Sequence, residues 1–242
     1  MGKIISIVNH NKESGKTVIS FNLASALSVI GKKTLYLTFR SNFLFEKLSL
    51  EFISESLFFE ELKNFSYEGF NTKIPCLDFF ILNTSLYDSE ENKNLVLFLK
   101  KYLKSVYDYV IIDTKSSLIE NFDIFMLLSD DYIIPIENNP KSFDSLTPLL
   151  AKIEWFKKEE GCRLNFFGFL FNKVSEDTRH YNLFKKNAFF LFRKVVLDHV
   201  IIYSPLLDSD YKPLNSIFED TMDKSFRCFI DLAEHITKGE NP

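Results

Sequence analysis

The stretch that decides the fold is residues 4–17, Ile4-Ile5-Ser6-Ile7-Val8-Asn9-His10-Asn11-Lys12-Glu13-Ser14-Gly15-Lys16-Thr17. Its apolar first part predicts a buried strand, a short polar loop follows, and Gly15-Lys16-Thr17 opens an amphipathic helical segment. Backbone N–H groups at a helix start attract anions, lysine adds a positive charge, and a threonine hydroxyl suits Mg²⁺. The stretch therefore predicts a phosphate-binding loop.

The rest of the chain predicts an α/β fold. Apolar periodicity indicates strands at 4–8, 34–38, 77–82, 109–113, 131–136, 164–172 and 195–202, and helices at 18–30, 90–106, 119–128, 142–158, 179–192 and 221–237. Residues 44–66 indicate one or two short helices; Gly31 is placed to cap the first helix, and Pro148 to bend a later one. We expect a three-layer, mostly parallel twisted sheet with helices on both faces.

Composition narrows the class of protein. With 242 residues, 46% of them hydrophobic, the chain fits one large domain over 1–238 and a disordered tail at 239–242. A net charge of −4 gives no overall field that attracts nucleic acid or anionic membrane. The three cysteines form no C-x-x-C pair, and no apolar run reaches the roughly 18 residues of a membrane span. We expect a cytoplasmic protein without a zinc or iron–sulfur site.

An ordered set of motifs follows the loop. Gly31-Lys-Lys-Thr-Leu-Tyr-Leu leads into the second strand, Tyr109-Val-Ile-Ile-Asp113 ends in an aspartate, and Asp131-Tyr-Ile-Ile-Pro-Ile and Gly168-Phe-Leu-Phe-Asn172 follow. In this order the chain resembles the ParA/MinD family of P-loop ATPases, whose deviant Walker A loop reads Lys-Gly-Gly-Val-Gly-Lys-Thr. The resemblance covers nearly the whole chain and implies the fold of a P-loop NTPase.

The resemblance implies a site for ATP or ADP with Mg²⁺. Lys16 would contact the β and γ phosphates, Thr17 would ligate Mg²⁺, Asp113 would hold the metal through water, and Asn172 would lie by the adenine. Ser14, Gly15 and Val18 complete the implied nucleotide-binding set. A structural explanation stands beside this one, since a strand-end aspartate also caps turns and an asparagine before a loop is a common turn former.

Three departures from the family pattern concern the chemistry. Asn11 stands where the family has its signature lysine, with Lys12 one position away, and Lys12 and Glu13 replace two glycines. Side chains forced into glycine-like conformations cost on the order of 1–3 kcal/mol. Arg40 replaces the aspartate that orients the attacking water, and Lys115-Ser116 follows Asp113-Thr114 in place of the family's usual residues. We therefore predict weak or absent ATP hydrolysis and assign no catalytic residue.

Three functions remain open. The first is a ParA-like partition or positioning protein for DNA or plasmid segregation, which forms nucleotide-controlled homodimers. The second is a catalytically dead binding module that contacts a ParB-like protein, a related ParA-like ATPase or DNA. The third is a small-molecule P-loop ligase or kinase of the dethiobiotin-synthetase type.

Two surfaces bear on the partners. The segment from 178 to 197, the basic strip, contains no acidic residue and could bind DNA without sequence preference, which would place the protein on the nucleoid. Its basic side chains are Arg179, His180, Lys185, Lys186, Arg193 and Lys194. The same strip is also explained as a solvated helix face. The carboxy-terminal segment lacks a basic amphipathic face, so membrane recruitment is not expected.

Overall fold

The computed structural model describes residues 2–38, 51–52, 66–71, 74–83, 90–114, 122–137, 142, 146–175, 182–183, 185–187, 190, 196–207 and 224–239. The strands are β1 (Lys3–Ile7), β2 (Thr34–Thr38), β3 (Glu51–Phe52), β4 (Ser66–Asn71), β5 (Leu77–Asn83), β6 (Tyr109–Asp113), β7 (Asp131–Glu137), β8 (Asn165–Val174) and β9 (Val196–Ile202). The helices are α1 (Lys16–Val29), α2 (Glu90–Val106), α3 (Phe122–Leu128), α4 (Leu146–Glu160) and α6 (Lys224–Lys238), with a 3₁₀ turn at Pro205–Leu207.

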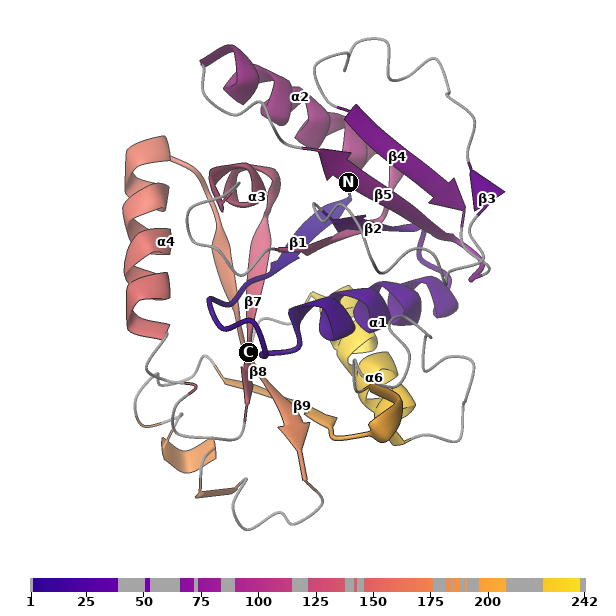
Figure 1. Cartoon of the computed structure of the whole chain (residues 1–242), viewed down its shortest axis with the longest axis vertical. Helices are drawn as coiled ribbons and strands as arrows, with labels where there is room; N and C mark the ends of the chain where they lie inside the picture. Colours follow the sequence, from indigo (N-terminus) through magenta and orange to yellow (C-terminus); the bar gives the residue numbers. More distant parts are fainter. Residues whose placement is uncertain are drawn as a thin grey trace.

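The nine strands of the described residues form one sheet in the order β3-β4-β5-β2-β6-β1-β7-β8-β9 (Figure 1). In this spatial order, the seven strands β5-β2-β6-β1-β7-β8-β9 are parallel to one another, and β4 and β3 add an antiparallel edge. β1 lies between β6 and β7, which places the loop after it among the carboxyl ends of parallel strands. Ligands bind at that end of open α/β sheets.

Two apolar cores sandwich the sheet. Ile4 of β1 packs into the core that includes α2, α3 and α4, whereas Ile5 and Ile7 pack into the core that includes α1 and α6. Successive strand side chains point to opposite faces, so a continuous apolar run such as that of β1 fills both cores. The predicted three-layer, mostly parallel fold is confirmed.

Most predicted elements match, with α2 and β6 agreeing to the residue. Gly31 caps α1 as predicted: its φ is +85°, its N–H bonds to the Ser28 carbonyl at 2.9 Å, and the Lys32 N–H bonds to Leu27 at 3.0 Å. α4 begins at Leu146, so Pro148 lies in its first turn, where a helix tolerates proline without bending. The predicted helix over 179–192 falls mostly outside the described residues.

The prediction of helices over 44–66 is wrong where the structure describes that range. Glu51–Phe52 forms β3, and Ser66 begins β4; these strands pair antiparallel with each other. Apolar pairs alternating with Glu and Lys fit a helical period over a short window, but the pairing of an edge strand depends on distant residues. The antiparallel edge formed by β3 and β4 therefore depends on tertiary contacts, which the local sequence pattern does not reveal.

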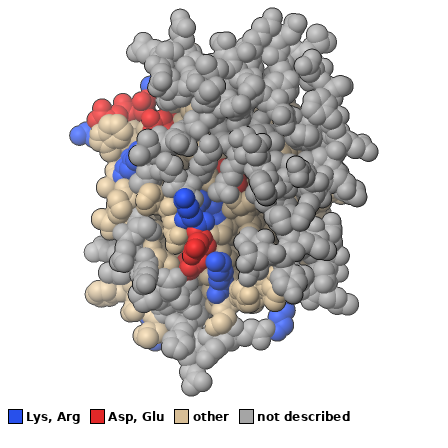
Figure 2. Space-filling model, in the orientation of Figure 1, with Lys and Arg blue, Asp and Glu red and all other residues tan. Residues whose placement is uncertain are grey.

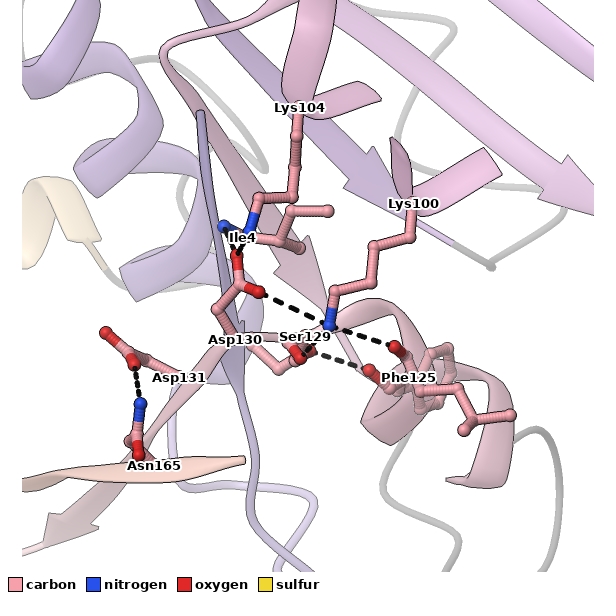
Figure 3. A network of polar contacts seen from close by, with 10 residues as sticks. Ile4, Lys100, Lys104, Phe125, Ser129, Asp130, Asp131 and Asn165 are labelled. Atoms are coloured by element: carbon pink, nitrogen blue, oxygen red, sulfur yellow. Dashed lines mark hydrogen bonds and ion pairs between the residues drawn. The ribbon is translucent and has the colours of Figure 1, made fainter. Parts of the chain in front are cut away.

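A polar network ties β1, α2 and β7 together at the end of the sheet opposite the phosphate loop (Figure 3). The Asp130 carboxylate accepts the Ile4 N–H at 3.0 Å and the Lys104 ammonium at 2.7 Å, and pairs with Lys100 at 3.3 Å. Burial raises the pKa of Asp130, but the hydrogen bonds from Lys104 and Ile4 and the two lysine charges outweigh it, so the pKa lies below its usual value. Burial lowers the pKa of Lys100 despite the attraction of Asp130.

We expect Asp130→Asn to lower the free energy of unfolding at pH 7 by about 1–3 kcal/mol, because two half-buried ammonium groups lose their counter-charge. A depressed carboxyl pKa contributes stability above the unfolded value and loses it as the pH falls, so the difference should shrink below about pH 4. Urea titrations between pH 3 and 7 measure it. Glu154→Gln, which removes an exposed i,i+3 pair with Lys157, is the control and should cost under about 0.5 kcal/mol. Equal losses in both variants would contradict the network's role.

Candidate functional site

The loop after β1 is shaped by asparagine side chains. Asn9 donates to the Pro135 carbonyl on β7 at 2.6 Å, and its Oδ1 accepts the Asn11 N–H at 2.8 Å. The Asn11 Oδ1 in turn accepts the Glu13 N–H at 3.0 Å, and the Ser14 hydroxyl donates to the Asn11 carbonyl at 3.0 Å. The bonds from the Asn11 and Glu13 N–H groups form two Asx-type turns, in which an asparagine side chain replaces a backbone turn contact. The loop holds its course with glycine only at position 15.

The strain expected at Lys12 and Glu13 is absent. Among the described non-glycine residues, positive φ occurs only at Cys76 and Lys173, so neither loop position adopts the conformation that demands glycine. The expectation assumed that a loop of this length follows the backbone course of its glycine-rich relatives. The two Asx turns give it another course with ordinary φ values.

Gly15 occupies the position that only glycine fits. Its φ of +80° is left-handed, and a Cβ there would lie 2.2 Å from the Asn172 amide nitrogen. Asn172 donates to the Ser14 carbonyl at 3.1 Å, so the end of β8 touches the loop directly. The loop therefore approaches β8 closely at Gly15, the N-cap residue of α1.

Lys16 lies inside the loop. Its side chain is buried, and its ammonium donates to the Asn11 carbonyl at 2.6 Å and to the Ser14 hydroxyl at 3.3 Å. Glu13, by contrast, is exposed to solvent. The loop thus keeps a lysine charge at its centre, hydrogen-bonded to its own backbone.

Asp113 joins three elements at the carboxyl end of β6. Its Oδ2 accepts hydrogen bonds from the Thr17 hydroxyl at 2.9 Å and the Tyr36 hydroxyl at 3.1 Å, and the residue is fully buried. Tyr36 is buried as well, stacked on Phe79 with ring centroids 5.2 Å apart. The next residue, Thr114, donates to the Ile7 carbonyl at 2.7 Å. A carboxylate and a threonine hydroxyl are hard oxygen donors, and Mg²⁺ binds through one or two carboxylates with water and phosphate oxygens. The residues fit Mg²⁺.

No three His, Cys, Asp or Glu side chains gather as a metal site among the residues that the structure describes. A magnesium ion held partly by nucleotide phosphates needs no such cluster. In the same part of the chain, no helix is long and apolar enough to cross a membrane.

The predicted site residues fall into two groups. Ser14, Gly15, Lys16, Thr17 and Val18 form the loop and the start of α1, and Asp113 and Asn172 are brought to them from β6 and β8. Arg40, Lys115 and Ser116 lie outside the described residues, as do Arg179, His180, Arg193 and Lys194 of the basic strip.

Two residues of the basic strip are described. Lys186 is exposed, and Lys185 donates to Asp198 at 2.8 Å. The hydrogen bond and charge of Lys185 lower the pKa of Asp198. Lys185 therefore offers less free positive charge to a phosphate than the sequence indicated. Elsewhere on the molecule, Figure 2 shows basic and acidic side chains of described residues next to one another near the middle of the face that it presents.

Sequence reasoning missed four residues that shape the site. Asn9 carried a signal, because an asparagine directly after a strand is a common turn former. Tyr36 stood in an apolar strand and was indistinguishable from a core aromatic residue. Lys173 and Glu137 meet only through the pairing of β7 and β8.

Comparisons with known proteins agree with this geometry. Residues 59–166 match a protein family described as an AAA domain. The sporulation initiation inhibitor protein Soj of Bacillus subtilis is 24% identical over 251 residues, covering 98% of each chain. The ATP complex of McdA from Cyanothece superposes with a TM-score of 0.74 at 17% identity, covering 98% of this chain and 96% of that one.

A partition protein gives a similar result. The putative plasmid partition protein of Borrelia burgdorferi, bound to AMPPNP, has a TM-score of 0.67 at 19% identity and covers 99% of this chain and 100% of that one. At such identities the structural likenesses establish the fold. With the ordered motifs, the strand order and the end-to-end similarity to Soj taken together, the chain is similar to P-loop proteins of the ParA/MinD family and has their fold.

Proposed function

We propose that this protein is a nucleotide-dependent partition or positioning switch that binds ATP or ADP with Mg²⁺ and hydrolyses ATP slowly or not at all. The observation that carries the proposal is the 2.9 Å contact between Thr17 and the buried Asp113, beside a lysine enclosed by the loop. These residues form the half of the site that binds a diphosphate and its metal. The likeness to a partition protein that holds a nucleotide analogue supports the same reading.

The chain's own groups divide the work of binding. Lys16 would exchange its contacts with the neutral oxygens of Asn11 and Ser14 for anionic phosphate oxygens, which add the attraction between opposite charges. Backbone N–H groups at the start of α1 face the phosphates. Thr17 and Asp113 would hold Mg²⁺, which would neutralise part of the phosphate charge.

Hydrolysis lacks two groups on which the family relies. Arg40 carries no carboxylate to orient a water, and Asn11 carries no charge for a partner's nucleotide. Phosphoryl transfer depends on positioning and charge stabilisation, so both losses fall on the chemical step rather than on binding. Nucleotide occupancy, and not turnover, then controls assembly into a homodimer and recruitment of a ParB-like protein, a related ParA-like ATPase or DNA.

A second function is a binding module that works without nucleotide. The hydrogen bonds of Lys16 within the loop favour it, because they satisfy the lysine charge when no phosphate is present. In that case the shape of the loop serves only to pack β1 against α1 and β8.

Lys16→Ala separates the two functions. If the loop binds nucleotide, the variant should weaken binding of a fluorescent ATP analogue with Mg²⁺ by about 10–100-fold, because it removes a charge-assisted contact with phosphate. Lys158→Ala, which removes an exposed lysine of α4, is the matched control and should stay within about twofold. Equal affinity of wild type and Lys16→Ala, or no binding by either, would favour the nucleotide-free module.

Turnover tests the chemical step. Wild-type protein saturated with MgATP should release phosphate at or near the background rate, because no carboxylate stands at position 40. The double variant Arg40→Asp and Asn11→Lys should raise the rate by about 100-fold or more if the remaining scaffold is competent. A clear Mg²⁺-dependent rate in the wild type would contradict slow hydrolysis and leave nucleotide binding intact.

Tyr36→Phe tests the assignment of Asp113 to the metal. Loss of one of the two donors to Oδ2 frees the carboxylate to rotate, and the Mg²⁺-dependent part of ADP affinity should fall about tenfold. Affinity in EDTA should not change. Tyr107→Phe is the control, because it removes a similar tyrosine–carboxylate contact, 2.9 Å to Asp78, at the other end of β6. A loss of affinity that is the same with and without Mg²⁺ would show that Tyr36 supports the loop and not the metal.

A further inference from the structure

Two consecutive residues at the end of β8 hold two consecutive carbonyls of the phosphate loop. Asn172 donates to the Ser14 carbonyl at 3.1 Å, and the Lys173 ammonium donates to the Glu13 carbonyl, also at 3.1 Å. Lys173 is in turn held by Glu137, the last residue of β7, at 2.8 Å. The loop tip is therefore fastened to two neighbouring strands through one lysine.

These contacts orient the loop's donors. In a trans peptide the carbonyl of one residue and the N–H of the next lie in one plane and point in opposite directions. The described peptide bonds include no cis bond. When the carbonyls of Glu13 and Ser14 face β8, the N–H groups of Ser14 and Gly15 must face away from it. Anion binding requires several N–H groups with a common direction, which these two contacts set.

The backbone of Lys173 shows that the arrangement is unusual. Its φ is +55°, in the left-handed region that side-chain-bearing residues seldom adopt. Asparagine and glycine are tolerated better there, yet a lysine occupies the position. A strained residue whose side chain reaches a ligand-binding loop is a candidate for a functional role. Glu137 lies opposite Asn172 in the strand register, so its carboxylate is near enough to hold the ammonium in place.

We propose that Lys173 is a positioning residue of the nucleotide site, which fixes the tip of the phosphate loop by holding the Glu13 carbonyl. The inference rests on the proposed function for the identity of the ligand. The loop geometry that it explains is a property of the nucleotide-free protein. Lys173 acts through the Glu13 peptide and needs no contact with the nucleotide.

The test compares Lys173→Met with wild type by two measurements. Amide hydrogen exchange over residues 10–15 of the nucleotide-free protein should become about tenfold faster, as one charge-assisted contact to the loop is lost. The dissociation constant for MgADP should rise about tenfold, because the loop must be ordered on binding. Lys173→Arg should restore most of both effects. Lys158→Met, an exposed lysine on α4, is the matched control and should change neither.

Lys173→Gly distinguishes positioning from general stabilisation. Glycine relieves the left-handed backbone, so the melting temperature should stay equal or rise, while loop exchange becomes faster and MgADP binding weaker. A fall in melting temperature with unchanged loop exchange would overturn the proposal, as would exchange and affinity of Lys173→Met within twofold of wild type. If wild type binds no nucleotide but Lys173→Met still speeds loop exchange, the proposed function fails and the positioning role stands.

Discussion

The hydrogen bond from Thr17 to Asp113 is the contact on which the site depends. It joins the first turn of α1 to the end of β6, although the two residues are 96 positions apart in the chain. A fully buried carboxylate requires partners, because an unpaired charge in the interior is costly. Thr17 and Tyr36 supply them from α1 and β2. A single oxygen atom thereby fixes three elements around the place where a metal would lie.

The loop shows how one geometry is reached by different residues. Glycine-rich loops turn freely because glycine adopts positive φ without strain. Here positive φ in the loop is confined to Gly15, while Asn9 and Asn11 turn the chain through their side chains. The Asn9 side chain also donates to the Pro135 carbonyl of β7, which ties the loop to that strand. In this loop, side-chain hydrogen bonds produce the turns that positive φ values produce in a glycine-rich loop.

Local patterns predicted what local physics decides. α2 and β6 were predicted to the residue, because an amphipathic stripe and a buried apolar run are signals of the segment itself. The position of Asp113 beside the loop was also predicted, since parallel strands bring their carboxyl ends to one edge. The polar strand Ser66–Asn71 was missed, because its pairing with β5 is set by residues beyond it. The contact of Lys173 with the loop required both a left-handed backbone and the register of β8.

Several contacts of the phosphate loop join residues that are far apart in the sequence, which bears on when the loop can fold during translation. Asn9 bonds to a carbonyl 126 positions later, and Ser14 to an amide 158 positions later. During synthesis the loop residues emerge long before β7 and β8, the strands that they contact. The loop therefore gains these two contacts only after 126 and 158 further residues have been made, the second figure being about two thirds of the 242-residue chain. A ribosome stalled before β8 would carry a nascent chain that has its phosphate-loop sequence but not its phosphate-loop form.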